Sequence, residues 1–297
     1  MPNHPGPGFG TRGHPPDLVS DASPWEVVKT WKWGEESAHT FSDGSAQGFQ
    51  GINWTSRNTA LADSLQVKAS GLEIGITASE STSRWYFTTM TGPIVFATLS
   101  DIVGSYSLKD TIVIQCLMDS DVTVQSGNES AQHVYGGLIV SDGGYGSGAS
   151  GNWYQANWYR QLSAATNYYH ARYGGGNTPS DAGDLSVLGT TGGDPPTFLE
   201  LVIYPGTGWT TGMSLDTTFQ EPLSVSTGVY HGNMQTSIPK DIGSGGGNQS
   251  PGTNPDFTLR PSNIKVGMFA AYLTTSGTRG SEVTVTFNQF RVLKRKA

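Results

Sequence analysis

Two stretches near the end of the chain decide the fold class: IKVGMFAAYL at residues 264–273 and SEVTVTFNQFRVL at residues 281–293. Both are apolar, both are strand-length, and a turn signal at Ser276-Gly277 lies between them. The pair is therefore predicted to form the closing hairpin of a β-sandwich.

The second stretch carries its apolar residues in period two, as a strand with one buried face does, at Val283, Val285 and Phe287. The alternation slips by one residue across Asn288-Gln289 and resumes at Phe290 and Val292. A slip of this kind predicts a β-bulge, because one extra residue shifts every later side chain to the opposite face.

The composition favours many short strands joined by turns. Of the 297 residues 40 are Gly, and only 14% are charged. Long helices would need more Ala, Glu, Lys and Leu at helical spacing, and no helix longer than two turns is expected. Further strands are predicted at 64–69, 72–78, 84–90, 93–99, 110–118, 121–125, 134–140 and 198–204.

Residues 25–33, WEVVKTWKW, alternate strictly and predict a strand with an aromatic face made of Trp25, Val27, Lys29, Trp31 and Trp33. Cys116, the single cysteine, lies in the apolar run TIVIQCLM and is expected to be a buried thiol.

The chain is predicted to comprise an extended Pro/Gly-rich arm at residues 1–24 and one sandwich domain at residues 25–297. Two segments poor in strand signal are expected as long loops at about residues 142–152 and 228–256. Such loops are functional, make subunit contacts or are merely flexible.

Net charge argues against a nucleic-acid partner. The formal charge is −7, and the one basic run, Lys294-Arg295-Lys296, is expected to be a solvated end. No window approaches the length of a membrane span, and the N-terminus has no signal-peptide pattern.

The C-terminal third resembles the concanavalin A-like lectin/glucanase sandwich. The resemblance rests on FLELVIY at 198–204, the strand at 264–271 and the V-x-F-x-x-F-x-V strand at 285–292. It implies an all-β, antiparallel jelly-roll sandwich of two curved sheets, in which the concave sheet and its rim loops commonly bind carbohydrate. A fold does not fix a function, so carbohydrate binding remains an analogy here.

The overall composition is similar to that of bacteriophage virion proteins. From the arm, the missing signal peptide and the missing catalytic motifs, the sequence predicts a non-enzymatic virion structural protein, such as a capsid decoration, fibre or tail component. The arm would dock on other virion subunits in a homo-oligomer assembled in the host cytoplasm, and the sandwich would contact surface polysaccharide.

No catalytic motif is found. The Glu-x-Asp-x-x-Glu strand motif of glycosidases on this fold is missing, as are H-E-x-x-H and G-x-S-x-G. No cofactor is predicted other than calcium, for which the candidate ligands are Asp119, Asp121 and Asp142. The alternative for Asp119 and Asp121 is a solvated strand end.

The strongest functional candidate is the aromatic segment at residues 152–173, NWYQANWYRQLSAATNYYHARY. Its aromatic rings could stack on sugar rings while its Asn, Gln and Arg side chains bind hydroxyls. The alternative is core and subunit interface, where Trp, Tyr and Arg are also enriched. The candidate carbohydrate-binding residues are Trp153, Asn157, Tyr159, Tyr168 and Arg172, together with Trp209, which is expected on an exposed loop.

Two other functions stay open. The first is a polysaccharide-active hydrolase or lyase on the same fold, for which the sequence offers Glu200, His170 and Tyr204 without motif spacing. The second is a jelly-roll viral shell protein, which the acidic balance and the lack of an Arg-rich arm disfavour.

Overall fold

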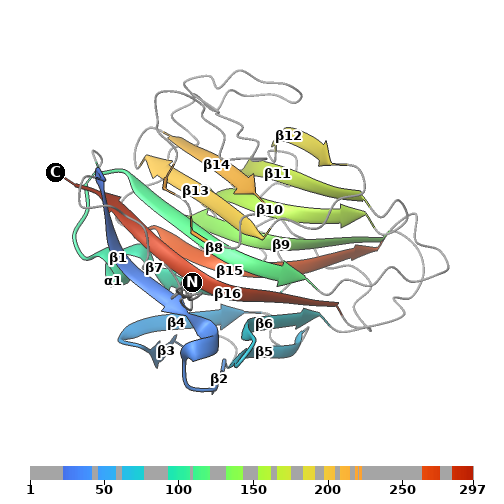
Figure 1. Cartoon of the computed structure of the whole chain (residues 1–297), viewed down its shortest axis with the longest axis horizontal. Helices are drawn as coiled ribbons and strands as arrows, with labels where there is room; N and C mark the ends of the chain where they lie inside the picture. Colours follow the sequence, from blue (N-terminus) through green and yellow to red (C-terminus); the bar gives the residue numbers. More distant parts are fainter. Residues whose placement is uncertain are drawn as a thin grey trace, which may run out of the picture.

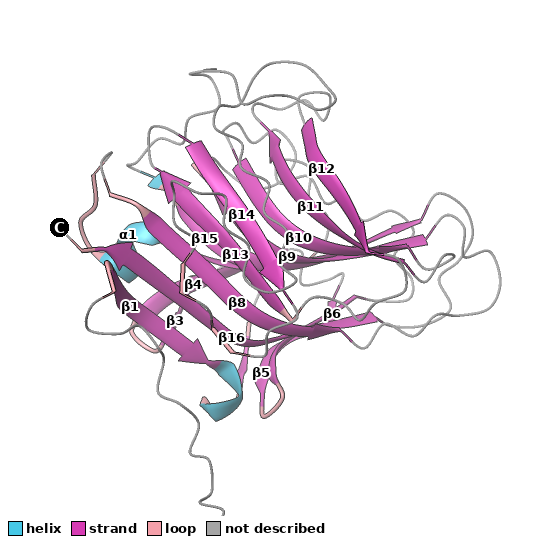
Figure 2. Ribbon diagram, turned by 45° about the horizontal axis from the view of Figure 1, so that its top comes forward, coloured by secondary structure: helices cyan, strands magenta, loops and turns pink. Residues whose placement is uncertain are grey.

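The computed structural model describes residues 23–41, 46–57, 62–76, 93–107, 110–120, 132–142, 153–161, 166–174, 183–190, 197–204, 208–214, 218–219, 221–222, 263–274 and 283–296. These residues form two antiparallel sheets packed face to face, as Figures 1 and 2 show. The prediction of an all-β, antiparallel jelly-roll sandwich of the concanavalin A-like type is confirmed.

Sheet A contains β1 (Trp25–Lys32), β2 (His39–Thr40), β5 (Ala62–Lys68), β6 (Gly71–Ile76), β8 (Ile112–Ser120), β13 (Phe198–Tyr204), β14 (Gly208–Ser214) and β16 (Val283–Arg295). Sheet B contains β3 (Ala46–Phe49), β4 (Ile52–Arg57), β7 (Ile94–Thr98), β9 (Gln132–Ser141), β10 (Trp153–Gln161), β11 (Thr166–Gly174), β12 (Gly183–Thr190) and β15 (Lys265–Thr274). Helix is confined, among the described residues, to the short η1 (Trp33–Glu35) and α1 (Leu99–Val103).

The strand order is β14-β13-β8-β16-β6-β5-β2 in sheet A and β12-β11-β10-β9-β15-β7-β4-β3 in sheet B, and β1 pairs with β16 beside this path. The predicted closing hairpin is therefore wrong. Strand β15 pairs with β7 and β9 in sheet B, whereas β16 pairs with β1, β6 and β8 in sheet A. The turn signal between them marks a crossover from one sheet to the other, which local sequence cannot distinguish from a hairpin.

The predicted bulge in β16 is confirmed. The ladder with β8 shifts between Phe287 and Gln289. Because of this shift, the apolar side chains on both sides of the bulge, Val285, Phe287, Phe290 and Val292, all lie in the core between the sheets.

The predicted single aromatic face of residues 25–33 is wrong. The β1–β16 register shifts between Val27 and Lys29, so the start of β1 presents the opposite face. Trp25 and Val27 pack on the outside of sheet A with Val113, whereas Trp31 lies in the core. Trp33 is also in the core, but in η1 rather than in the strand.

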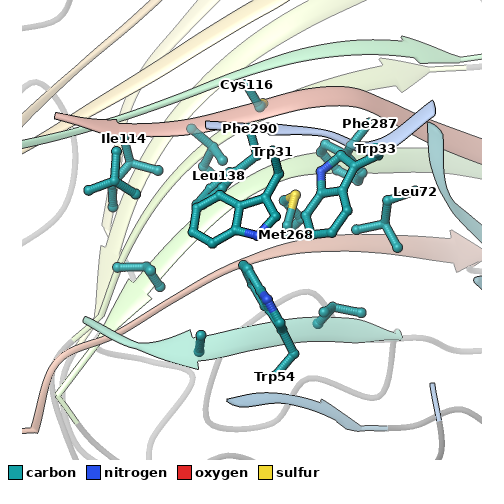
Figure 3. Packing of buried hydrophobic residues seen from close by; sticks show 14 of the residues in the cluster. Trp31, Trp33, Trp54, Leu72, Ile114, Cys116, Leu138, Met268, Phe287 and Phe290 are labelled. Atoms are coloured by element: carbon teal, nitrogen blue, oxygen red, sulfur yellow. The ribbon is translucent and has the colours of Figure 1, made fainter. Parts of the chain in front are cut away.

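Three tryptophans form the centre of the core at the β1 end of the sandwich (Figure 3). Trp31, Trp33 and Trp54 are all fully buried, and Trp54 comes from sheet B. The ring centroids of Trp31 and Trp33 lie 5.2 and 5.5 Å from that of Trp54, in edge-to-face contacts. Aromatic pairs of this geometry contribute beyond the area that they bury, so this cluster ties the two sheets together. Cys116 is buried, as predicted, and burial raises the pKa of its thiol.

The sheets approach most closely where β9 crosses β16. A Cβ atom added at Gly136 would lie 2.8 Å from Cγ1 of Val285 and 3.4 Å from Cε of Met118. Glycine at this position lets the backbone of sheet B lie directly against side chains of sheet A.

The outer face of sheet A is closed by a buried polar row. Arg291 Nε donates a hydrogen bond of 2.6 Å to Gln115 Oε1, and Gln115 Nε2 donates to Glu200 Oε2. The ring of Phe219 covers the guanidinium, with its centroid 4.3 Å from Arg291 Cζ. All three polar side chains are fully buried, and apolar clusters flank them: Trp25, Val113, Val202 and Leu293 on one side, Leu117 and Phe198 on the other.

Several predicted elements lie outside the described residues, namely the strands at 84–90 and 121–125, residues 1–22 of the arm, and the two loops except for Asp142. The division into arm and sandwich domain stays a prediction. No helix within the described part of the chain is long and apolar enough to cross a membrane.

The close approach at Gly136 predicts that Gly136→Ala lowers the free energy of unfolding by about 1–3 kcal/mol, because the added methyl group overpacks a filled interface. Gly48→Ala is the matched control, since a Cβ there would have its nearest neighbour 3.9 Å away. Urea denaturation of both variants measures the difference. Equal stability of the two variants would contradict the packing described above.

The polar row predicts that Glu200→Leu lowers the free energy of unfolding by about 3–5 kcal/mol, because Arg291 then keeps a buried charge without its anionic counterpart. The double variant Glu200→Leu/Arg291→Met should regain much of the loss, since it removes both charges. The same denaturation measurement applies, and a double variant less stable than Glu200→Leu would argue against charge burial as the cause.

Candidate functional site

The outer face of sheet B is the candidate site, and strand alternation defines which residues occupy it. Val134, Leu138, Ala156, Val266 and Met268 point into the core between the sheets. The alternate positions on the same strands therefore lie on the face turned away from sheet A. Figures 1 and 2 show β9, β10, β11 and β12 side by side in this sheet.

Charge distinguishes this sheet from the rest of the chain. Within the strand bounds described above, sheet B holds one acidic residue, Asp184, against the basic residues Arg57, Arg160, Arg172 and Lys265 and the histidines His133 and His170. The whole chain has a net charge of −7, and the strands of sheet A carry the acidic residues Glu26, Asp63, Glu73, Asp119 and Glu200. Sheet B is thus a basic sheet in an acidic protein.

The registers align polar residues in rows across β11, β10 and β9. The three rows are Arg172–Gln155–Ile139, His170–Asn157–Gly137 and Tyr168–Tyr159–Tyr135. All lie on the outer face, because Gln155 and Asn157 alternate with the core residue Ala156. Neighbouring strands are about 4.8 Å apart and successive rows about 7 Å apart, so one sugar unit can reach groups from two rows.

The middle of the face is apolar and buried. Tyr135, Ile139, Phe96 and Phe269 are each at most 6% exposed, and they lie outside the cluster between the sheets. Gln155, fully buried, borders this area from β10. Gly267 lets β7 approach here, since a Cβ atom on it would lie 2.4 Å from the carbonyl oxygen of Val95.

A polar cluster stands at one end of the face, where β15 begins. Lys265 Nζ donates a 3.1 Å hydrogen bond to Asn263 Oδ1, and Asn263 Nδ2 donates a 3.3 Å bond to the carbonyl oxygen of Asp142. Burial lowers the pKa of Lys265, and the nearby charge of Asp142 opposes that shift. The ammonium group is therefore held partly out of water at the edge of the sheet.

Five of the six predicted carbohydrate-binding residues come together on this face: Trp153, Asn157, Tyr159, Tyr168 and Arg172. The sixth, Trp209, does not. It lies in β14 of sheet A, paired with Ile203, so its expected position on a loop is wrong. The turn signals on both sides of Trp209 mark the ends of a short strand rather than a loop. Carbohydrate binding by the other five stays a prediction.

The candidate calcium ligands are not brought together. Asp119 is exposed near the end of β8 in sheet A, Asp142 lies in the Lys265 cluster, and Asp121 falls outside the described residues. Among the residues that the structure describes, no group of three His, Cys, Asp or Glu side chains is placed to hold a metal ion. Calcium binding stays a prediction.

The residues offered for a hydrolase or lyase do not form one site. Glu200 and Tyr204 lie in β13 of sheet A, whereas His170 lies in β11 of sheet B. Glu200 is buried against Gln115 on the outside of the other sheet. Of the three, His170 alone stands on the basic face, because strands adjacent in composition are separated by the sandwich.

Sequence reasoning missed Gln155, Lys265 and Arg57 as candidates. Gln155 shares the period-two face of Asn157 and Tyr159, and that signal was available. Lys265 and Arg57 had no such signal, since their proximity to this face follows from the pairing of β15 and β4 through β7.

Comparisons with known proteins were made at the level of sequence and of structure. No protein-family profile matches the chain, and no curated protein does. Among solved structures, an alginate lyase from Pseudomonas aeruginosa matches 76% of this chain and 83% of its own, at 15% identity and a TM-score of 0.38. The alginate lyase A1-II', a member of polysaccharide lyase family-7, matches 76% and 81%, at 10% identity and a TM-score of 0.39. An endo-1,3-β-glucanase from Streptomyces sioyaensis matches 97% and 100%, at 10% identity and a TM-score of 0.41.

These matches are to the sandwich fold, and the three proteins are all enzymes. The prediction of a non-enzymatic protein is thereby contradicted. That prediction depended on missing contiguous motifs, and a site assembled from several strands leaves none. None of the three matches is a virion protein, and the predicted virion role, arm docking and oligomeric state have no support from them.

Proposed function

We propose that this protein binds an acidic polysaccharide on the outer face of sheet B and cleaves it by β-elimination. The observation that carries the proposal is the charge of this face. It places Arg57, Arg172, Lys265 and two histidines at outward positions against a single carboxylate, in a chain whose net charge is −7. A basic surface retained on an acidic protein favours an anionic ligand.

The row Arg172–Gln155 supplies groups for a sugar carboxylate. A guanidinium can donate two parallel hydrogen bonds to a carboxylate, and an amide adds a third donor. Asn157 stands on the same face one row away. Neutralising the carboxylate of a uronic acid makes the adjacent C5 proton acidic enough to be removed, which is the first requirement of elimination.

The next two rows supply groups for proton transfer. In the proposed step His170 takes the C5 proton, the C4–O4 bond breaks as the C4=C5 double bond forms, and a tyrosine gives its proton to O4. Tyr159 and Tyr168 stand one row from His170 on the same face. Histidine and tyrosine are both established types of general acid and base.

Elimination is favoured over hydrolysis by the lack of a carboxylate pair. Glycoside hydrolysis by the common route uses two Asp or Glu residues flanking the scissile bond. The described strands of sheet B provide only Asp184, which is in register with Arg172.

The proposal predicts that the protein releases unsaturated oligosaccharides from an acidic polymer, detected by the ultraviolet absorbance of the new double bond. The test panel contains alginate, polygalacturonate and hyaluronate, with a neutral 1,3-β-glucan for comparison. His170→Asn should lower kcat about 10²–10⁴-fold by removing the base. Arg172→Gln should lower kcat/KM about tenfold or more by removing a charged contact.

Arg295→Gln is the matched control, because it removes the same charge from an exposed position at the end of β16 in sheet A. It should leave the rate unchanged. Reducing ends released without the double-bond absorbance would show hydrolysis and contradict elimination. Activity confined to the neutral glucan would contradict the acidic substrate.

A further inference from the structure

Lys265 occupies the outer face at a distance from the groups proposed to react. It is in register with Ser141 of β9 and Thr98 of β7, and Ser141 is in register with Trp153 of β10. This row lies two rows from His170–Asn157, about 13 Å along the strands, and Lys265 is three strands from His170, about 14 Å across the sheet. A sugar unit that reacts at His170 cannot also contact Lys265.

The side chain of Lys265 is held in place rather than extended into water. It is half-buried, and its ammonium group donates to Asn263 Oδ1. Asn263 is fixed in turn through the carbonyl oxygen of Asp142 at the end of β9. Holding a long side chain in one position removes an entropy cost that a ligand would otherwise have to offset.

The cluster is more than the strand ladder requires. Backbone pairing with β7 and β9 already fixes the start of β15, and the alternate residue Val266 anchors it in the core. Burial disfavours the charged form of Lys265, so the group is kept here at a cost that an arriving anion would offset. Lys294, on sheet A, differs in having an ion pair of 3.1 Å with Asp110 and a bond to the carbonyl oxygen of Ser105.

We propose that Lys265 binds a carboxylate on a sugar unit beyond the one that reacts, with Asn263 orienting its ammonium group. This inference rests on the proposed function, since it assumes that an acidic chain lies on the outer face of sheet B. It makes Lys265 a specificity-determining residue that acts on long chains. Oligosaccharides too short to reach from His170 to Lys265 would not use it.

The test measures binding separately from cleavage. Retardation in native gels containing alginate or polygalacturonate is compared for the wild type, Lys265→Gln, Lys265→Arg, Arg57→Gln and Lys294→Gln, after thermal unfolding has shown that each variant is folded. Lys265→Gln should weaken binding about tenfold, as expected for the loss of one charge-assisted hydrogen bond. Lys265→Arg should restore most of the affinity, and Lys294→Gln should bind like the wild type.

Chain length provides the second readout. Lys265→Gln should raise KM for the polymer while leaving kcat and the KM for the shortest cleaved oligosaccharide unchanged. The inference is overturned if Lys265→Gln binds like Lys294→Gln, if Arg57→Gln weakens binding and Lys265→Gln does not, or if the wild type binds neither polymer. Binding that depends on Lys265 without cleavage would support this inference and overturn the elimination reaction. Cleavage that is independent of Lys265 would do the reverse.

Discussion

The sandwich depends on strand β16, which pairs with β8 along one edge and with β6 and then β1 along the other. Its bulge between Phe287 and Gln289 is what allows this, because the extra residue restores the inward phase for Phe290 and Val292 after Phe287. Without the bulge, either half of the strand would turn its apolar side chains outward. The tryptophan cluster follows from the same constraint, since Trp31 packs against Phe290 with their ring centroids 5.4 Å apart.

The two outer faces of the sandwich have different chemistry. On sheet A, the fully buried row Arg291–Gln115–Glu200 satisfies its charges internally and lies beneath Phe219, so this face is part of the folded structure. On sheet B, the strands present basic, amide, imidazole and phenol groups with almost no acid. One face thus pairs its charges within the protein, and the other offers basic groups to a ligand. This division is the basis for placing the proposed site on sheet B.

The site illustrates why a search for contiguous motifs gave the wrong answer about enzymatic activity. Its proposed groups come from β10, β11 and β15, and residues such as Gln155 and Lys265 are more than a hundred positions apart in the chain. The period-two pattern of residues 153–161 was enough to place Trp153, Asn157 and Tyr159 on one face. It could not show that β11 would align His170 and Arg172 beside them, or that Glu200 would lie on the other sheet. Register between distant strands is set by the packing of whole faces, not by local sequence.

The sequence by itself determined the fold class, the position of the bulge in β16, the burial of Cys116 and the alternation of each strand, because these depend on the period of apolar residues along a short segment. Tertiary structure alone decided that β15 and β16 belong to different sheets, that Trp25 and Trp31 face opposite sides, and that the basic residues of sheet B share one surface. Each of these depends on which strands become neighbours. Strand pairing is chosen by contacts between segments far apart in the chain, and a local pattern carries no record of its partner.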